Sequence, residues 1–456
     1  MAYSILKSYK LKFTPFEIFT ALRQEKNCFF LDSSLNANLL GRYSFLGIDP
    51  FYILETKGED PLPKLREILA RYKVANHKNG PPFLGGAVGY LAYDLGFILE
   101  KKLKIKPKPS PGIPDCLFAF YNTVIILDHL KKITHISSVG FPEKKYRLEK
   151  TLCESNVRKI ERLLSRINTC ESGNGKNKPQ NKPLGLKSNF TKEGYILAVK
   201  KAKEYIRRGD IYQVNLAQEF QAQATLSGWE IYRRLRKISP SYFSSYFDAG
   251  GQQILSSSPE GFLRLQAGRV TTRPMKGTRA RSQNRIKDAK LKKELLDSAK
   301  DKAELAMIVD LERNDLGRVC NYDSIKVDTF RQLEEYSTVF QTTASVYGSL
   351  HKNKDNLDLI RACFPGGSIT GCPKIRAMEI IEELEPSRRS IYTGCLGYLS
   401  FCGNMDLNIL IRTILKKEDK LYFSVGGGIV ADSRPQAEYE ETLVKAKAMM
   451  EAINAL

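Results

Sequence analysis

The amino-acid sequence predicts an α+β fold with large antiparallel β-sheets. Short β-rich segments occur in runs, and helices are inserted between these runs without a regular strand–helix alternation. Of the 456 residues, 42% are hydrophobic. This is enough apolar material for a large core, either in one big domain or in several smaller ones.

Residues 1–168 form a first region that is rich in strand patterns punctuated by glycine and proline. The strand patterns are NCFFLDSS, GRYSFLGIDPFYILET, FLGGAVGYLAYDLG and LFAFYNTVIILDH. PLPKLREILARYK, with Pro63 near its first turn, predicts a helix, and EKKYRLEKTLCESNVRKIERLLSRI predicts another that closes the region. Residues 169–188 are polar and rich in glycine and proline, which is the composition of a linker.

Residues 189–456 form a second region. It opens with the helix pattern TKEGYILAVKKAKEYIRRGD, begun by Thr191 and stopped at Gly209, and continues with the strand pattern IYQVNLAQEFQAQ. GQQILSSS, GFLRLQ and GRVTTRP predict an antiparallel meander, and two helices follow. A second meander, whose central strand is buried on both faces, is predicted by the segments YTGCLGYLSF, NMDLNILIRTIL and KLYFSVGGGIV. A final helix is expected to begin at about Pro435.

The charge and the apolar runs limit the classes of function. Lysine and arginine number 72 against 50 acidic residues, which gives a formal charge of +22. Because the basic residues are scattered and no recognition-helix or RNP-like motif occurs, we expect acidic small molecules rather than nucleic acid as partners. No apolar run approaches the roughly 20 residues that span a bilayer, and the N-terminus does not resemble a signal peptide. We therefore expect a cytoplasmic protein without a membrane partner.

The nine cysteines include no CxxC pair, and the four histidines lack the spacing of a zinc site. Neither a disulfide framework nor bound zinc is indicated. The sequence also lacks a GxSxG elbow, a P-loop, a GxGxxG context, and the Cys/His/Glu arrangement that a glutamine amidotransferase uses.

Two predicted helices carry acidic residues three positions apart. Asp301 and Glu304 share one face of KDKAELAMIVDLERND, and Glu438 and Glu441 share one face of AEYEETLVKAKAM, with Lys445 one turn beyond. Two such faces meeting would suit Mg²⁺, which takes a few carboxylate oxygens and leaves other positions for water or substrate. The alternative is a solvated helix face with i,i+4 salt bridges.

Three further segments are suited to bind an anion. Thr370 and Gly371 precede the helix pattern of FPGGSITGCPKIRAMEIIEELEP, whose free N–H groups favour a carboxylate or phosphate, unless the segment is an ordinary turn and cap. Gly427 and Gly428 in VGGGIV permit close backbone approach to a ligand, or a simple bulge. Arg412 lies in the apolar pattern NILIRTIL, and a bidentate carboxylate is the natural partner of a buried guanidinium.

Taken together, these segments resemble the chorismate-utilising enzymes. The resemblance extends from about Phe190 to the C-terminus through GDIYQVNLA, SSSPEGF, RPMKGT, DKAELAMIVDLERNDLGRV, FPGGSITGCPKIRAMEIIEELEP, GYLSFCGNMD, NILIRT and VGGGIVADSRPQAEYEET. In the first region, LDSS and GRYSFLGIDP stand in the order expected for this family. The resemblance implies a four-layer αββα fold, with two large, mainly antiparallel sheets packed face to face and helices outside.

The same resemblance implies a magnesium site and a substrate site. Glu304 and Glu441 would hold Mg²⁺, supported by Asp301 and Glu438, and the ring carboxylate of chorismate would bind this metal. Arg412 and Tyr392 would hold the enolpyruvyl carboxylate, with backbone groups near Gly427 and Gly428. The pocket would be lined by Thr370, Gly371 and Lys445.

Two positions distinguish the branches of this family. Members that add water to the ring have a basic lysine where this sequence has Gln213, and an amide takes up no proton at neutral pH, so ammonia is the expected nucleophile. Lys276 in RPMKGT stands where anthranilate synthases usually have alanine, and it resembles the lysine viewed as a nucleophile in aminodeoxychorismate synthases. The expected function is therefore that of aminodeoxychorismate synthase component I, which makes 4-amino-4-deoxychorismate for p-aminobenzoate and folate synthesis. The alternative is anthranilate synthase component I, which also eliminates pyruvate.

In the expected reaction, Lys276 attacks ring C2 as the 4-hydroxyl leaves, and ammonia then enters at C4 and expels the lysine. The attacking amine must be neutral, so burial or the neighbouring Arg273 and Arg279 should lower its pKa. Glu260 in SSSPEG is the candidate general acid for the leaving hydroxyl. A salt-bridged Lys276 and a Glu260 in a solvated turn are the alternatives. VFQTTAS has Gln341 where the family usually has histidine, which places more of the proton transfer on Glu260.

The expected partners follow from the same resemblance. Because no glutaminase sequence is present, ammonia should come from a separate glutamine amidotransferase subunit. Ser33 in LDSS and Tyr242 in PSYF match the region where family members can bind tryptophan. A chorismate-binding protein with weak or no turnover, motivated by Gln341, is a further alternative.

Overall fold

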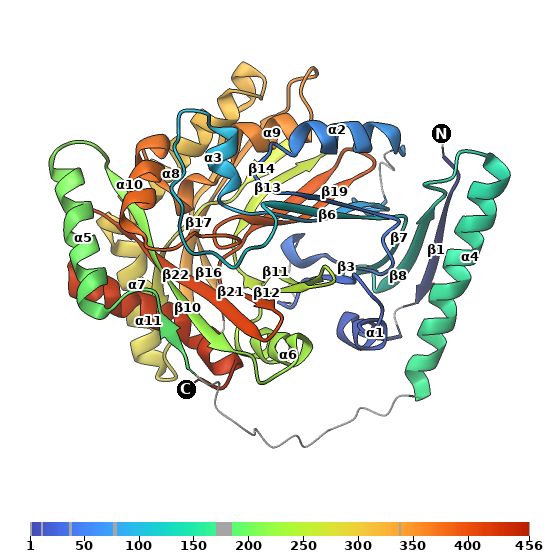
Figure 1. Ribbon diagram of the computed structural model, residues 1–456, viewed down its shortest axis with the longest axis horizontal. Helices are drawn as coiled ribbons and strands as arrows, with labels where there is room; N and C mark the ends of the chain where they lie inside the picture. Colours follow the sequence, from blue (N-terminus) through green and yellow to red (C-terminus); the bar gives the residue numbers. More distant parts are fainter. Residues whose placement is uncertain are drawn as a thin grey trace.

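The computed structural model consists of two large β-sheets packed face to face, with helices on their outer sides (Figure 1). It describes residues 2–10, 12–35, 39–75, 80–169, 185–336 and 339–455. Every strand pair in this part of the chain is antiparallel. The predicted α+β class and its four-layer arrangement are confirmed.

The first sheet contains, among the described residues, 12 strands in the order β1-β8-β7-β3-β2-β11-β12-β21-β22-β10-β18, with β9 paired to β10. Their bounds are β1 Ser4–Lys10, β2 Phe29–Asp32, β3 Tyr43–Gly47, β7 Thr123–Asp128, β8 Ile133–Val139, β9 Lys187–Ser188, β10 Gln213–Gln223, β11 Phe243–Asp248, β12 Gln252–Ser258, β18 Gly371–Cys372, β21 Thr413–Lys417 and β22 Lys420–Ile429.

The second sheet contains, in the same described ranges, 10 strands in the order β15-β17-β14-β13-β20-β19-β5-β6-β4, with β16 paired to β17. Their bounds are β4 Tyr52–Thr56, β5 Gly86–Leu91, β6 Cys116–Tyr121, β13 Gly261–Gln266, β14 Arg269–Thr272, β15 Met275–Ala280, β16 Lys326–Glu335, β17 Val339–Ser349, β19 Cys395–Ser400 and β20 Met405–Ile409.

Both sheets combine strands from the two predicted regions. In the first sheet β2 pairs with β11, and in the second β5 pairs with β19. Most of the predicted linker, residues 170–184, lies outside the described residues. The division into two regions therefore stays a prediction, while the sheets themselves are built by the whole chain.

The helices cover the outer faces of the sheets. They are α1 Pro15–Leu22, α2 Leu62–Arg71, α3 Leu95–Leu99, α4 Tyr146–Ser165, α5 Lys192–Arg207, α6 Gly228–Ile238, α7 Arg285–Asp297, α8 Ala299–Gly317, α9 Asn356–Cys363, α10 Lys374–Leu384 and α11 Pro435–Ala452. The predicted start of α5 is confirmed, because Thr191 caps it by accepting a hydrogen bond from the Gly194 N–H. Gly209, with φ of +82°, follows its end. α5, α8, α10 and α11 gather at one end of the molecule, and α4 covers the other (Figure 1).

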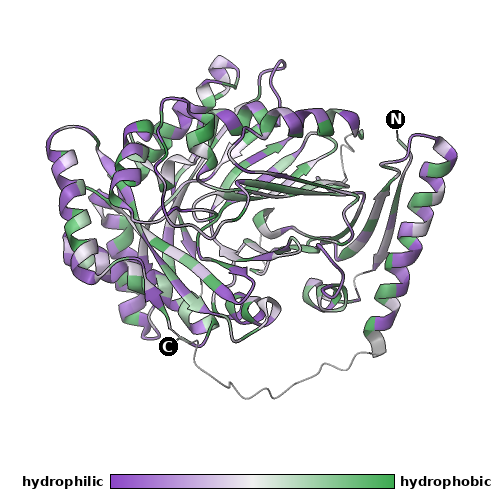
Figure 2. Ribbon diagram, viewed as in Figure 1, coloured by the Kyte–Doolittle hydropathy of each residue, from purple (hydrophilic) through white to green (hydrophobic). Residues whose placement is uncertain are grey.

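Apolar side chains from both sheets fill the space between them. Phe29 of β2 and Phe247 of β11 belong to the same buried cluster as Phe83 and Tyr398, the second of which lies in β19 of the opposite sheet. The central strands carry many hydrophobic residues, whereas the helices mix hydrophilic and hydrophobic ones (Figure 2). Within the described ranges, no helix is both long and apolar enough to cross a membrane.

The two predicted meanders are each divided between the sheets. β12 lies in the first sheet, while β13 and β14 lie in the second. β19 and β20 lie in the second sheet, while β21 and β22 lie in the first. The prediction of one continuous strand for NMDLNILIRTIL is therefore wrong, because the chain leaves β20 after Ile409 and enters β21 at Thr413, with Arg412 at a φ of +49°. Alternating apolar residues predict strands, but they do not say which sheet each strand joins.

These two passages between the sheets lie side by side. The Ile409 N–H donates to the Glu260 carbonyl oxygen at 3.0 Å, and the Ser257 N–H donates to the Arg412 carbonyl oxygen at 3.1 Å. The fold thus places the candidate acid Glu260 and the candidate carboxylate-binding Arg412 on adjacent crossing segments.

A buried carboxyl group on α8 gives a test of this core. Glu312 is buried and accepts a hydrogen bond of 2.8 Å from the Thr272 hydroxyl, and burial raises the pKa of its carboxyl to about 8. A raised pKa means that the stabilising effect of the neutral form is complete at acidic pH and is lost as the pH rises through that value. We expect Glu312→Gln, which cannot ionise, to raise the melting temperature by several degrees at pH 9 and to change it little at pH 5.

Scanning calorimetry at the two pH values measures this difference. Glu335→Gln serves as the control, because it removes an exposed carboxylate that is paired with Lys292 and lies outside the core. A Glu312→Gln protein that is less stable than the native one at pH 9 would mean that the ionised carboxylate is accommodated in the core.

Candidate active site

Glu260 lies on the crossing between β12 and β13, and only 5% of it is exposed. The Ser368 hydroxyl donates to its Oε1 at 2.7 Å. Burial raises the pKa of this carboxyl, although the Ser368 hydrogen bond and the charge of Lys276 oppose the rise. The alternative of a solvated turn is excluded, and burial favours the protonated form of Glu260.

Lys276 lies in β15 beside a break in the strand pairing. The register of β15 against β17 shifts between Lys276 and Thr278, and the intervening Gly277 has a φ of +69°. A Cβ atom at Gly277 would lie 2.8 Å from Leu295 Cδ1 and 3.1 Å from Asp301 Cβ, so glycine is required by both conformation and space. The KGT sequence thus forms a bulge that sets the direction of the Lys276 side chain.

The Lys276 amine donates to the Ser368 carbonyl oxygen at 2.9 Å. Ser368 therefore contacts both candidate catalytic groups, Glu260 through its hydroxyl and Lys276 through its carbonyl. Ser368 was not among the predicted site residues, although it lies within the PGGSITG segment. Among the described residues no carboxylate forms an ion pair with Lys276, so the salt-bridged alternative does not hold.

Burial lowers the pKa of the Lys276 amine from its ordinary value, while the charges of Glu304 and Glu260 oppose this and that of Lys445 assists it. The predicted direction agrees, but the predicted contribution of Arg273 and Arg279 is wrong. Each arginine has its own acidic partner, Glu334 for Arg273 and Asp301 at 3.0 Å for Arg279. These partners neutralise the arginines, so burial is the main cause of the lowered pKa.

The acidic faces of α8 and α11 approach each other. Burial raises the pKa of Glu304; the charges of Lys276 and Lys300 oppose this rise, and those of Asp301 and Glu438 assist it. Burial also raises the pKa of Glu438, as does the neighbouring Glu441. Because the charge of Glu438 on α11 raises the pKa of Glu304 on α8, the two acidic faces lie close enough to interact and are not two separate solvated faces.

Three of these acids have close protein partners. Asp301 is paired with Arg279, Glu438 accepts a hydrogen bond of 2.6 Å from Ser433, and Glu441 is paired with Lys445 at 2.7 Å. The cation nearest to Glu304 is Lys300, at 3.8 Å. Glu441 keeps 51% of its side chain exposed. Glu304 is therefore the least engaged of the four, and Glu441 the most accessible.

The donor set fits a hard divalent cation that also takes oxygen atoms from substrate and water. In the described part of the chain, no three histidine, cysteine or acidic side chains are grouped closely enough to hold a metal by themselves. A pair such as Glu304 and Glu441 would thus have to be completed by other ligands. Gly427 leaves room beside the two acids of α11, since a Cβ there would lie 3.2 Å from Glu438 Oε2 and 3.7 Å from Glu441 Oε1.

Gly428 and Gly371 both face strand β10. A Cβ at Gly428 would lie 2.3 Å from Gln213 Nε2, and one at Gly371 would lie 2.2 Å from the Gln213 carbonyl oxygen. The buried Gln213 amide has a hydrogen-bond partner at neither its nitrogen nor its oxygen among the described residues. The Thr370 hydroxyl donates to the Gly366 carbonyl oxygen at 2.9 Å. The unpartnered side-chain amide therefore lies beside Gly428, and the backbone of the same residue lies beside Gly371; both glycines are predicted residues of the substrate pocket.

Arg412 is partly buried, and its guanidinium forms no hydrogen bond or ion pair with any described residue. Burial lowers the pKa of its guanidinium, with Tyr336 and Glu260 opposing. The buried Tyr392 lies near this segment, because the Thr393 N–H donates to the Leu410 carbonyl oxygen at 2.8 Å. A partly buried cation without a partner is suited to bind a carboxylate.

Gln341 on β17 lies opposite Thr278 of β15, one position from the partner of Lys276. Its Nε2 donates to the Thr278 hydroxyl at 3.2 Å, and its buried Oε1 has no partner among the described residues. The Gln341 side chain is thus close to Lys276 and offers a hydrogen-bond acceptor but no titratable proton.

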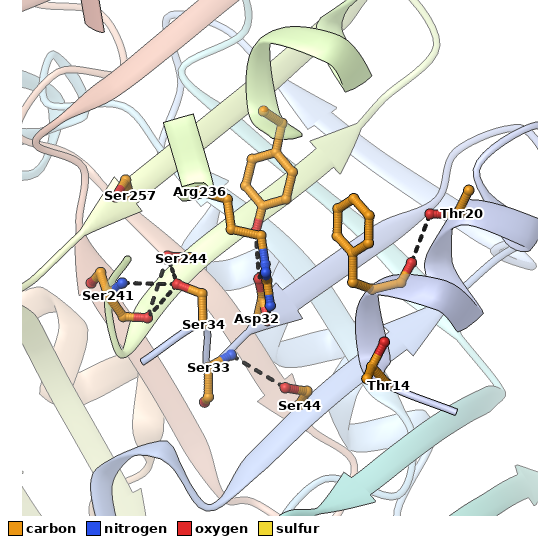
Figure 3. A network of polar contacts seen from close by, with 12 residues as sticks. Thr14, Thr20, Asp32, Ser33, Ser34, Ser44, Arg236, Ser241, Ser244 and Ser257 are labelled. Atoms are coloured by element: carbon orange, nitrogen blue, oxygen red, sulfur yellow. Dashed lines mark hydrogen bonds and ion pairs between the residues drawn. The ribbon is translucent and has the colours of Figure 1, made fainter. Parts of the chain in front are cut away.

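Ser33 and Tyr242 are the residues predicted to bind tryptophan. Both line one cavity of about 70 Å³ between the sheets, together with Arg42, Tyr43 and Asp406. The Ser33 hydroxyl donates to the Tyr43 carbonyl oxygen at 2.8 Å, and its N–H donates to the Ser44 hydroxyl at 3.2 Å. Ser34, Ser241 and Ser244 join the LDSS and PSYF segments through further hydrogen bonds (Figure 3). Sequence analysis therefore placed two segments at one cavity, while the ligand stays a prediction.

The sequence of residues 26–451 matches the family of chorismate binding enzymes. The chain is 40% identical to anthranilate synthase component 1 of Aquifex aeolicus, over 96% of this chain and 92% of that protein. It is 38% identical to anthranilate synthase component 1 of Acetivibrio thermocellus, with the same coverage of 96% and 92%. The chain belongs to the chorismate-binding enzyme family.

A solved structure agrees with the fold of this chorismate-binding enzyme. Anthranilate synthase component I from Streptococcus pneumoniae is 32% identical, with a TM-score of 0.78 over 91% of this chain and 93% of that one. The menaquinone-specific isochorismate synthase of Escherichia coli shares the fold at 17% identity, with a TM-score of 0.74 over 99% and 95% of the two chains. The predicted family is confirmed, but these relatives favour the anthranilate synthase alternative over the expected aminodeoxychorismate synthase.

Proposed function

We propose that this enzyme adds ammonia to chorismate and that anthranilate is its product. The relatives named anthranilate synthase component 1 support this proposal, because they align with almost the whole chain. The observation that carries the amination step is the group formed by Glu260, Lys276 and Arg412, which offers an acid, a partly buried amine and an unpartnered cation in one place.

The residues have separate tasks in this reaction. Arg412 and Tyr392 bind the enolpyruvyl carboxylate, and Thr370, Gly371, Gly427, Gly428 and Lys445 line the pocket. Glu304 and Glu441, supported by Asp301 and Glu438, would hold Mg²⁺, which when bound supplies positive charge for the ring carboxylate. Glu260 gives its proton to the 4-hydroxyl, which leaves as water while ammonia bonds to C2. Loss of a ring proton and elimination of pyruvate then give anthranilate.

A second candidate product is 4-amino-4-deoxychorismate, which two observations favour. Lys276 places a partly buried amine of lowered pKa near Glu260, so the lysine itself can attack C2 before ammonia enters at C4 and expels it. Gln341 also exchanges no proton where the family usually has histidine, which disfavours the proton transfers of pyruvate elimination. This candidate would serve p-aminobenzoate and folate synthesis.

The product decides between the two candidates. Chorismate, Mg²⁺ and an ammonium salt are incubated with the enzyme, and the products are analysed by mass spectrometry together with a pyruvate assay. Anthranilate with one equivalent of pyruvate supports the main proposal. 4-Amino-4-deoxychorismate without pyruvate supports the second, and its loss in Lys276→Ala would assign the nucleophile. Chorismate that stays unchanged would reject both and leave a binding protein.

The source of ammonia is proposed to be a separate glutamine amidotransferase subunit. We expect the isolated chain to use ammonium salts but not glutamine, and to gain glutamine-dependent turnover when the amidotransferase subunit of its host is added. Glutamine-dependent turnover by the isolated chain would overturn this proposal.

The cavity at Ser33 and Tyr242 is proposed to bind tryptophan. Its lining combines the Arg42 and Asp406 charges with aromatic side chains, which suits the ammonium, carboxylate and indole groups of that ligand. Isothermal titration with tryptophan should give heat and raise the melting temperature, and both signals should weaken in Ser33→Trp, which fills the cavity. No heat and no thermal shift would remove tryptophan as a ligand.

A test of the magnesium site uses Glu304→Gln, which keeps the shape of the side chain but removes its charge. We expect the Mg²⁺ concentration for half-maximal turnover to rise by about tenfold or more, with little change in melting temperature. Glu440→Gln on α11 is the control, because Glu440 is exposed and hydrogen-bonded to Gln436 of its own helix. Equal Mg²⁺ dependence in both variants would mean that Glu304 is only a surface charge.

A further inference from the structure

Arg389 lies in the segment between α10 and β19, and only 4% of it is exposed. Its guanidinium makes five hydrogen bonds. Nε and Nη2 donate to the two carboxylate oxygens of Glu385 at 2.9 and 2.7 Å, Nη2 also donates to the Asn215 carbonyl at 2.8 Å, and Nη1 donates to the Ile369 carbonyl at 2.9 Å and the Thr393 hydroxyl at 3.3 Å. Five N–H donors are all that an arginine side chain has.

The neutral partners of Arg389 come from three segments of the candidate substrate site. Ile369 directly precedes Thr370, and Thr393 directly follows Tyr392. Asn215 lies on β10, and its N–H donates to the Thr370 carbonyl oxygen at 2.8 Å. One guanidinium therefore joins β10, the segment that carries Thr370 and the segment that carries Tyr392.

Glu385 balances the charge of Arg389 and adds a further bond to the same strand, because its Oε1 accepts a hydrogen bond of 2.9 Å from the Ala217 N–H. The Arg389 guanidinium also lies 4.6 Å from the ring centroid of Tyr93 and 5.7 Å from that of Tyr392. The planar group thus contacts the ring of a candidate substrate-binding residue as well as the backbone around it.

The segment that holds Tyr392 adopts an unusual backbone conformation. Ser390, two residues before Tyr392, has a φ angle of +52°, and Thr393, directly after it, has one of +63°. A β-branched residue such as Thr393 rarely adopts a positive φ angle. Conformations of this kind persist only where the surrounding structure holds them. Here the Thr393 hydroxyl donates to the Tyr392 carbonyl at 2.6 Å and accepts from Arg389.

We infer that Arg389 is a positioning residue for chorismate, which holds Thr370 and Tyr392 against β10 so that the pocket is formed before the substrate arrives. The inference rests on the proposed placement of the substrate beside these two residues. Arg389 itself is engaged by protein groups at every N–H, so it acts through its neighbours and not by touching the substrate.

The decisive variant is Arg389→Lys. It keeps the positive charge beside Glu385 but offers three donors without the planar fork, so the three segments cannot all be held. We expect the KM for chorismate to rise by about tenfold or more while kcat changes by less than about threefold, because the reacting groups Glu260 and Lys276 are bound by Ser368 and not by Arg389.

The matched control is Arg388→Lys. Arg388 is the neighbouring arginine, is also paired with a glutamate, Glu382, and bonds the Lys106 carbonyl instead of the site. We expect its KM to stay within about twofold of that of the native enzyme.

Calorimetric titration of chorismate without ammonia provides a readout that does not depend on turnover. If the enzyme binds chorismate but fails to aminate it, the proposed function is rejected while the binding comparison still tests Arg389. At least tenfold weaker binding in Arg389→Lys, with native binding in Arg388→Lys, supports the inference. A lower melting temperature in Arg389→Lys with native affinity overturns it, because the role is then only structural.

A second variant covers the case in which Arg389→Lys fails to fold. Glu385→Gln keeps the shape of the pair and leaves Arg389 in place, but it removes the charge that orients the guanidinium. We expect chorismate affinity to fall by about threefold to tenfold. Native affinity in a folded Glu385→Gln protein would contradict a positioning role.

Discussion

Replacing Glu260 with glutamine should lower kcat for chorismate consumption by about 10²–10⁴-fold, with a smaller change in KM. Glutamine retains the carbonyl oxygen that accepts the Ser368 hydrogen bond, so the local structure should persist. It cannot supply the proton that the departing 4-hydroxyl requires. The expected loss applies to both candidate products, because the same hydroxyl leaves in each reaction.

The decrease of chorismate absorbance measures this loss without regard to product. In the native enzyme, activity should fall as the pH rises through the pKa of Glu260, which burial raises above its ordinary value, because the acid must be protonated. Glu260→Asp should keep this alkaline limb at reduced activity, whereas Glu260→Gln should lose it. Glu335→Gln, an exposed control, should leave the profile unchanged. Activity within tenfold of the native value in Glu260→Gln would show that another group donates the proton.

The sequence was sufficient to predict helices because their signals are local. Thr191 and Gly209 mark the two ends of α5, and the three-residue spacing of Asp301 and Glu304 places both on one face of α8. The assignment of strands to sheets was not predictable in this way. β12 and β13 follow each other in sequence yet join different sheets, and this depends on contacts with strands far along the chain.

Residues of the candidate site could likewise be predicted only where the signal lies in the local sequence. Arg412 could be singled out because an arginine in an apolar segment needs a partner, and the acidic pairs because two helices repeat one spacing. Ser368 could not, since a serine in a glycine-rich turn is ordinary and its importance comes from contacts with Glu260 and Lys276. Arg273 and Arg279 were misjudged for the converse reason, because their neutralising partners lie on other elements.

Replacing Arg412 with methionine should lower kcat/KM for chorismate by about 10²–10³-fold and should at the same time stabilise the free protein. A charge pair with a bound carboxylate is worth about 2–5 kcal/mol when one partner is truncated, and each 1.4 kcal/mol corresponds to about tenfold in affinity. In the free protein, however, the Arg412 guanidinium has no hydrogen-bond or ion-pair partner among the described residues, and burial lowers its pKa. Removing an unpartnered, partly buried charge relieves a desolvation cost.

Opposite changes in activity and stability therefore distinguish a binding arginine from a structural one. Steady-state kinetics and thermal unfolding of Arg412→Met measure the two effects, and Arg313→Met is the control, because Arg313 is exposed on α8 and paired with Asp310. Arg412→Lys should recover part of the activity, since it restores the charge without the bidentate fork. A protein with Arg412→Met that loses both activity and stability would mean that the guanidinium holds the crossing between β20 and β21 together, and that another group binds the carboxylate.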